Sequence, residues 1–171
     1  MNKLNENKQI ESKVSRQLND KITNWVYDKH LNYVEPQEQV TKIAEELNEL
    51  YDALHHEDYF YEVMDAIGDM YVAASTLFVE MNDHGLDYDI IQHINCKVGA
   101  MDLSFTYNNI YHYALNGDYE TASSIIVNTF FNQLNAFCNA YQFNLRDAVA
   151  CAYSHIKRRP ERYYEETKEW K

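Results

Sequence analysis

The sequence predicts an all-α protein, a helical bundle of about five to six helices. Glycine and proline, which supply the tight turns between strands, number only four and two in 171 residues. Apolar residues recur at spacings of three and four along most of the chain, which is the period of an amphipathic helix. With 46% hydrophobic residues the chain can form one core, so we expect a single domain over residues 1–171.

The charge and hydropathy of the chain narrow the classes of partner. The formal net charge of −12 argues against a nucleic-acid polymer, because phosphate backbones are bound by clustered Lys and Arg. No stretch approaches the roughly 18 apolar residues of a membrane span, and the first residues lack the apolar core of a signal peptide. We therefore expect a cytoplasmic protein with no membrane partner.

The cysteines and histidines form no recognisable metal motif. Cys96, Cys138 and Cys151 show no CxxC spacing, so neither a disulfide framework nor a zinc site is predicted, and buried free thiols are expected. Apart from the adjacent pair His55 and His56, no histidine stands at ligand spacing from a cysteine or another histidine.

A first amphipathic helix is predicted over about residues 9–30, with the polar residues 1–8 outside it. Its apolar positions are Ile10, Val14, Leu18, Ile22, Trp25 and Val26. Trp25 belongs to this stripe, which favours a core role for its ring. Pro36 is placed to occupy the first turn of a second helix.

The second helix, about residues 37–55, combines an apolar stripe with a polar ridge. The stripe consists of Val40, Ile43, Leu47, Leu50 and Leu54. Taking ~100° per residue, an arc of roughly 80° beside the stripe holds Gln39, Lys42, Glu46 and Glu49. This ridge therefore lies next to the core rather than opposite it.

The third helix, about residues 59–82, is apolar on nearly all sides except at three acids. Glu62, Asp65 and Asp69 fall within about 60° of one another. A helix of this kind is buried on both sides, so its acids are expected to line a cleft. Gly68 costs about 1 kcal/mol of helix propensity and would let another backbone or a ligand approach.

Additional helices are predicted over about residues 86–141. Gly85 is expected to cap the preceding helix, and residues 86–116 predict one or two helices with a break at Gly99. After a turn at Asn116 and Gly117, Asp118 opens a strongly apolar helix, whose bulky side chains we expect at an oligomer contact.

The last helix, about residues 144–160, begins at an Asn144 cap and ends in the densest basic cluster of the chain. Lys157, Arg158 and Arg159 in that cluster would suit phosphate groups. Their alternative role is to complement the dipole at a helix C-terminus.

The carboxylates of the second and third helices are suited to divalent cations. Hard ions such as Mg²⁺ take oxygen ligands, usually a few carboxylates together with substrate phosphates. The alternative is two solvated acidic helix faces. Glu45, Glu46 and Glu49 repel one another at helical spacing unless a cation compensates, which favours the metal interpretation.

These motifs carry a resemblance to a known family. The first is Gln39-x-x-Lys42-x-x-Glu45-Glu46-x-x-Glu49-Leu50, followed by Asp65-Ala-Ile-Gly-Asp69 and then by Ile156-Lys-Arg-Arg159. In order and spacing they resemble the MazG-like branch of the all-α nucleoside triphosphate pyrophosphohydrolases, which are related to the dimeric dUTPases and dCTP pyrophosphatases. The resemblance covers about residues 22–82 and 144–160.

The resemblance implies an enzyme that hydrolyses a (deoxy)nucleoside triphosphate to the monophosphate and pyrophosphate, in nucleotide-pool cleansing or balancing. It implies Mg²⁺ as the cofactor, with Mn²⁺ as an alternative, and a homodimer or homotetramer. The metal ligands of the family would fall on Glu46, Glu49 and Asp69.

One position departs from the family pattern. Counting back three residues from Asp69 gives Ala66, where the family has a carboxylate. Asp65 or Glu62 would have to supply the missing ligand. The alternative function is therefore a catalytically degenerate helical protein that binds a metal or a partner.

The remaining roles follow from the same motifs. Glu45 is the first choice for the catalytic base that takes a proton from water. Substrate-binding roles are predicted for Gln39, Lys42, Tyr153, Lys157 and Arg158. Trp25 is an alternative contact for base, sugar or phosphate, although its apolar stripe favours core packing. Asn95 and Lys97 form a second candidate group for the phosphates.

Overall fold

The computed structural model describes residues 3–56, 60–88 and 97–158, with side chains from Lys13 onward. Within these ranges the chain is helical and contains no strand, which confirms the predicted all-α class. The elements are α1 (Lys3–Asp28), the short 3-10 helix η1 (Leu31–Tyr33), α2 (Pro36–Ala53), α3 (Phe60–Asn82), α4 (Ala100–Leu115), α5 (Tyr119–Ile125), the π-helical segment η2 (Ile126–Phe130), α6 (Phe131–Ala140) and α7 (Leu145–Ile156). Because α5, η2 and α6 run on without a break, the predicted number of helices also holds.

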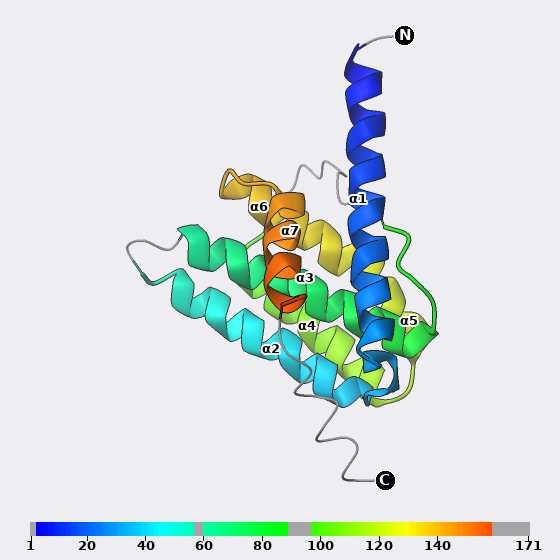
Figure 1. The fold of residues 1–171 in the computed structure, drawn as a ribbon. Helices are drawn as coiled ribbons and strands as arrows, with labels where there is room; N and C mark the ends of the chain where they lie inside the picture. The colour runs from blue at the N-terminus through cyan, green and yellow to red at the C-terminus, as the bar shows by residue number, and fades with distance from the viewer. Residues whose placement is uncertain (1–2, 57–59, 89–96, 159–171) are drawn as a thin grey trace.

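The bundle is built around α3, which packs against α1, α2, α5, α6 and α7. Figure 1 shows α2 beside α3, with α7 crossing in front of them. Every residue of α3 from Met70 to Val79 is buried, as expected for a helix covered on both sides. Asp65 and Asp69 interrupt the buried surface and are half-buried.

The second helix begins as predicted, with Pro36 in its first turn. A proline there loses no helical hydrogen bond, because the first N–H groups of a helix have no partner within it. The apolar stripe of α2 is buried against α3 through Val40, Ile43, Leu47 and Leu50. The polar ridge of the same helix therefore lies at the edge of this interface.

The start of the first helix and the residue that caps the third differ from the prediction, although the third helix ends at Asn82 as expected. The first helix begins at Lys3 rather than near residue 9. At the end of α3, Asp83 rather than Gly85 adopts the left-handed conformation, with φ of 51°. The Asp83 N–H donates to the carbonyl of Val79 at 2.8 Å and closes the helix, since a short polar residue tolerates this conformation better than most.

Most of the other expected boundaries hold, and the helix start expected at residue 86 does not. Gly99 precedes α4, which confirms the predicted break, and Gly117 forms the turn with φ of 76°. The side chains of Asp118 and Asn144 cap α5 and α7 by accepting a hydrogen bond from a backbone N–H. Residues 85–88 are not helical, so the helix expected from residue 86 does not begin there.

The apolar helix after Gly117 turns its bulky side chains inward. Ile126, Phe130, Phe131, Leu134 and Phe137 are all buried within one chain. These side chains therefore do not form the expected oligomer contact, and the homodimer or homotetramer stays a prediction. No helix in the described part of the chain has the length and apolar character of a membrane span.

Candidate functional site

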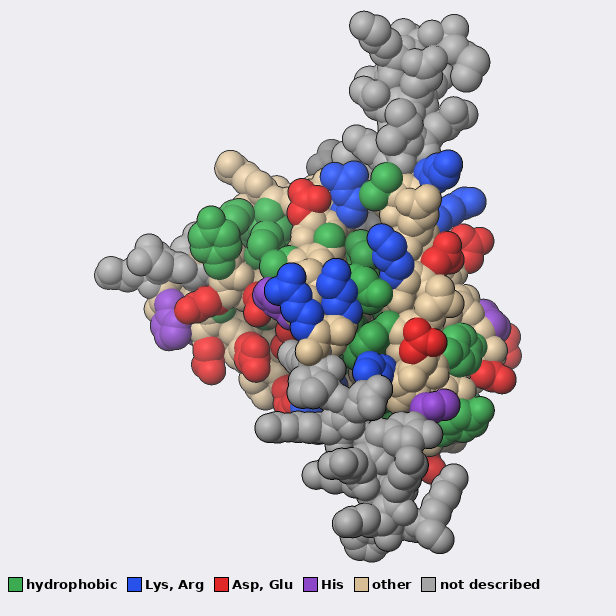
Figure 2. Space-filling view, in the orientation of Figure 1, with side chains coloured by type: hydrophobic (Ala, Val, Ile, Leu, Met, Phe, Trp, Pro, Cys, Tyr) green, Lys and Arg blue, Asp and Glu red, His purple; other side chains and the backbone are tan. Residues whose placement is uncertain are grey.

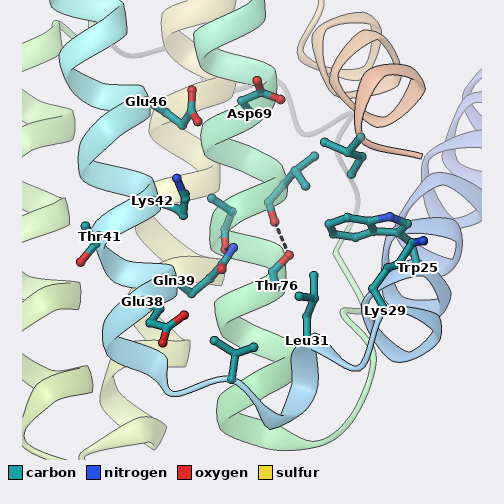
Figure 3. A pocket seen from close by; sticks show the side chains of 14 residues that line it. Trp25, Lys29, Leu31, Glu38, Gln39, Thr41, Lys42, Glu46, Asp69 and Thr76 are labelled. Atoms are coloured by element: carbon teal, nitrogen blue, oxygen red, sulfur yellow. Dashed lines mark hydrogen bonds between the residues drawn. The ribbon is translucent and has the colours of Figure 1, made fainter. Parts of the chain in front are cut away.

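A pocket of about 380 Å³ lies between α2 and α3 and is closed by the end of α1, η1 and the last turn of α7. Figure 3 shows its lining side chains. They are Trp25, Lys29, Leu31, Val34, Glu38, Gln39, Thr41, Lys42, Glu46, Asp69, Val72, Ala73, Thr76 and Ile156. The pocket therefore contains four of the predicted metal- and substrate-binding residues, Gln39, Lys42, Glu46 and Asp69. It also contains Trp25, for which a core role was favoured.

Glu46 and Asp69 bring carboxylates from two helices to the same end of this pocket (Figure 3). Both are half-buried, because each stands next to the stripe through which α2 and α3 pack. Two acids held at a partly dehydrated surface repel each other more strongly than in water. This end of the pocket is therefore suited to a cation.

The rest of the pocket is largely apolar. Trp25, Leu31 and Ile156 approach from α1, η1 and α7, and the Trp25 indole lies on the far side of the pocket from Glu46 (Figure 3). Trp25 also packs against the core, so its predicted core role describes only part of its position. Its indole N–H is buried and makes no hydrogen bond to any residue that the structure describes.

Polar groups line the wall between these two ends. The Gln39 amide donates a long hydrogen bond, 3.5 Å, to the carbonyl of Ala73. Lys42 forms an ion pair with Glu45, which is exposed one turn further along α2. Glu45 itself is exposed and does not line the pocket, so the predicted base stands at its rim, beside Lys42.

The remaining predicted ligands differ in position. Glu49 is exposed on α2, and Glu62 is exposed and 3.0 Å from the imidazole of His56. Asp65 is half-buried one turn from Asp69, about 6 Å along the helix axis, whereas Glu62 is about 10 Å away. Asp65 is therefore closer than Glu62 to Asp69, the α3 residue at the acidic end of the pocket.

The predicted carboxylates do not form a compact group. Among the described residues, no three of them have donor oxygens within 4.8 Å of one another. Which of Asp65 and Glu62 would complete a metal site stays a prediction.

Where α7 crosses α3, Gly68 permits close contact. A Cβ atom at Gly68 would lie 2.4 Å from the carbonyl oxygen of Ala148 and 3.0 Å from the Cβ of Ala152. The prediction that another backbone approaches Gly68 is therefore confirmed. The crossing brings Cys151 and His155 beside Asp65, with His155 Nδ1 3.4 Å from Asp65 Oδ1.

Burial, and then the charges of Asp65 and Asp69, raise the pKa of the Cys151 thiol. Neither Cys151 nor His155 was predicted as a site residue, and the expectation that no histidine stands at ligand spacing from a cysteine is wrong. The available signal was their four-residue separation, which puts both side chains on one face of a helix.

The predicted basic residues lie at the end of α7. Lys157 Nζ is 5.9 Å from the centre of the Tyr153 ring, and Lys157 and Arg158 are exposed. None of these three lines the pocket, although Ile156, immediately before Lys157, does. Lys and Arg side chains gather over this end of α7 in Figure 2. Arg159 and Asn95 lie outside the described residues, and Lys97 is exposed.

A half-buried acid on α3, Glu80, also escaped prediction. Glu80 has both carboxylate oxygens buried without a hydrogen-bond partner among the described residues. Burial, and then the negative charge of Glu38, raise the pKa of Glu80 to about 9. This carboxyl therefore carries a proton at neutral pH.

Comparison with known proteins adds no relative: no protein-family model, no curated protein and no solved structure matches this chain. The resemblance to the MazG-like enzymes consequently rests on the motifs of the sequence.

Proposed function

We propose that this protein is a Mg²⁺-dependent nucleoside triphosphate pyrophosphohydrolase. The observation that supports the proposal most is the pocket with two different ends. Glu46 and Asp69 occupy one end and Trp25 the other, with Gln39 and Lys42 between them. A nucleotide has the complementary division, because its phosphates attract cations and its base offers a flat aromatic surface.

The size of the pocket agrees with this ligand. Pockets for small ligands and cofactors usually span roughly 300–1,000 Å³, and this one has a volume of about 380 Å³. That volume suits the nucleoside part of the substrate. The triphosphate would extend past Glu46 and Asp69 toward the exposed acids and bases at the rim.

The donor set fits Mg²⁺, since Glu46 and Asp69 offer only oxygen and are partly exposed to the pocket. Glu46, Glu49 and Asp69 would hold the ion, with Asp65 or Glu62 as the additional carboxylate. When bound, the ion would offset the charge of the phosphates and lower the pKa of a coordinated water.

The side chains of this chain would act on the reactants as follows. Glu45 accepts a proton from the attacking water, and its ion pair with Lys42 keeps the carboxylate in place. The water oxygen bonds to the α-phosphorus as the bond from that phosphorus to the bridging oxygen breaks. Pyrophosphate leaves with the electron pair of that bond, and Lys157 and Arg158 neutralise its charge.

Recognition of the nucleoside falls to the inner wall. Trp25 stacks on the base through the face of its ring. Gln39 gives its weak bond to Ala73 in exchange for a stronger one to the ligand. Polar groups of this kind discriminate between bases because a mismatched ligand leaves them unpaired.

The direct test incubates the purified chain with a panel of ribonucleoside and deoxyribonucleoside triphosphates and Mg²⁺, and measures pyrophosphate. We expect release from at least one nucleotide, and loss of activity in Glu46→Gln and Asp69→Asn. Glu120→Gln, an exposed acid on α5 far from the pocket in sequence and outside its lining, is the matched control and should remain active. Activity that survives in both pocket variants would overturn the assignment.

A second candidate function is a non-catalytic protein that binds Mg²⁺ or a partner. Two observations favour it: Ala66 stands at a family ligand position, and no three predicted carboxylates of the described chain lie within 4.8 Å of one another. This protein would release no pyrophosphate from any nucleotide. It would still show a rise in melting temperature with Mg²⁺, and Asp69→Asn would reduce that rise.

A further inference from the structure

Three side chains that could bind a metal ion meet where α7 crosses α3, one turn from Asp69. Asp65 of α3 and Cys151 and His155 of α7 each offer one donor atom, and these atoms all lie within 4.8 Å of one another. Among the described residues, no other group of three His, Cys, Asp or Glu residues has its donor atoms this close together.

The group stands on rigid supports. Cys151 and His155 are four residues apart on α7, so both side chains project from one face of that helix. The crossing at Gly68 fixes α7 against α3, because the backbone of Ala148 fills the space that a side chain would need. Ligands held by two packed helices are better preorganised than ligands on loops.

The donors differ in kind from those at the end of the pocket. A thiol, an imidazole and a carboxylate are the ligands of Zn²⁺ and similar ions, whereas Mg²⁺ takes oxygen. Donors around a tetrahedral Zn²⁺ lie roughly 3.3–3.8 Å apart, given bonds of about 2.0–2.3 Å. His155 and Asp65 already have this separation, at 3.4 Å, so only a modest movement of side chains is required.

We infer that Asp65, Cys151 and His155 form a binding site for a thiophilic divalent ion such as Zn²⁺. Three protein ligands leave a fourth position open, and the exposure of His155 lets water or another ligand reach it. The alternative is a simple ion pair between Asp65 and His155, with the thiol as a bystander.

The site has a consequence for the activity, which rests on the proposed function. Asp65 is also a candidate ligand for Mg²⁺, so an ion held by Cys151 and His155 draws this carboxylate away from the pocket. Thiophilic ions should therefore inhibit pyrophosphate release at concentrations well below that of Mg²⁺.

The test uses Co²⁺, which replaces Zn²⁺ and reports its own ligands. The full chain is freed of metal with a chelator and titrated with Co²⁺ under reducing conditions. We expect one ion per chain, a near-ultraviolet charge-transfer band from a thiolate bound to Co²⁺, visible bands of a tetrahedral ion, and displacement of all of them by Zn²⁺. Cys151→Ser should lose the charge-transfer band, and His155→Ala should lower the Co²⁺ affinity more than about tenfold.

Two other cysteines provide matched controls. Cys138→Ala removes a thiol buried in the core, and Cys96→Ser removes one outside the described residues. Both variants should keep the band, and circular dichroism establishes that each variant is folded. The inference is overturned if the wild type gives no band, if Cys151→Ser retains it, or if it disappears with Cys96 or Cys138.

The outcome is independent of the proposed activity, because the spectra require no nucleotide. A chain that releases pyrophosphate but gives no Co²⁺ band refutes this site alone. A chain that binds Co²⁺ through Cys151 but hydrolyses no nucleotide refutes the enzyme assignment alone.

Discussion

The half-buried acid Glu80 makes the stability of the protein depend on pH. Its carboxylate oxygens have no hydrogen-bond partner among the described residues, and its pKa rises from the ordinary 4.5 to about 9. Between these two values the folded chain retains a proton that the unfolded chain has released. The free energy of unfolding therefore falls as the pH rises through this window, and becomes constant above about pH 9.

The size of the effect follows from the difference between the pKa of Glu80 in the folded chain and in the unfolded chain. A difference of one pH unit corresponds to about 1.4 kcal/mol of free energy. At pH 7, which is about 2.5 pH units above the ordinary value of 4.5, the shifted pKa of Glu80 lowers the free energy of unfolding by up to roughly 3 kcal/mol. Because Glu80 is not fully buried, solvent lowers this figure, and we expect about 1–3 kcal/mol.

The substitution that tests this reasoning is Glu80→Gln, which keeps the shape of the protonated acid and cannot ionise. Urea unfolding of the wild type and the variant at pH 5, 7 and 8.5 would give the difference in stability. The two should be close at pH 5, and the variant should become progressively more stable as the pH rises. Glu120→Gln, an exposed acid, should show no such trend. A difference between Glu80→Gln and the wild type that stays constant from pH 5 to 8.5 would refute the assignment of Glu80 as a half-buried, protonated acid.

Substitutions at three further positions test the fold and the pocket. Gly68→Ala should lower the free energy of unfolding by about 1–3 kcal/mol in urea titrations, since its Cβ would collide with the backbone of Ala148, and an unchanged stability would contradict the close crossing. Gly117→Ala should lower the free energy of unfolding by about 1–2 kcal/mol in the same assay, because a φ of 76° strains an L-residue. Collision is not the reason here, since the added Cβ would meet no atom within 4 Å. Gly117→Asn should cost less, since asparagine adopts this conformation more readily. If the proposed function holds, Trp25→Ala should raise KM for the nucleotide with a smaller effect on kcat, Trp25→Phe should retain most of the affinity, and equal KM values in all three would exclude stacking.

Much of the helical framework could be predicted because each local signal is physical and short in range. Pro36 begins α2, and Asn144 caps α7, as expected from the geometry of helix starts. The end of α3 at Asn82 was predicted, but its cap was not, because Asn82, Asp83 and Gly85 are all plausible caps. Which of them takes the left-handed conformation depends on the path of the chain that follows.

The arrangement of the site was less predictable. The apolar period indicates which face of a helix is buried, but not which helix covers it. The acids Glu46 and Asp69 could be paired because α2 and α3 are consecutive. Cys151 and His155 could not be placed beside Asp65, since no local pattern reveals that α7 crosses α3 at Gly68.

Trp25 and Glu80 illustrate the same limit within single helices. The stripe of α1 indicated that Trp25 faces inward, yet the interior at that point includes the wall of a pocket. Glu80 looked like an ordinary helical acid, and only the packing around α3 shows that it is deprived of water. In both cases the role depends on segments that are distant in sequence.

The central claim is that water attacks the α-phosphorus of a nucleotide held at Glu46 and Asp69. The most direct measurement is hydrolysis of the preferred triphosphate with Mg²⁺ in water labelled with heavy oxygen. We predict that the label enters the monophosphate, that pyrophosphate stays unlabelled, and that Asp69→Asn lowers the rate more than about 100-fold. Label in the pyrophosphate, an unchanged rate in Asp69→Asn, or no hydrolysis of any nucleotide would contradict this claim.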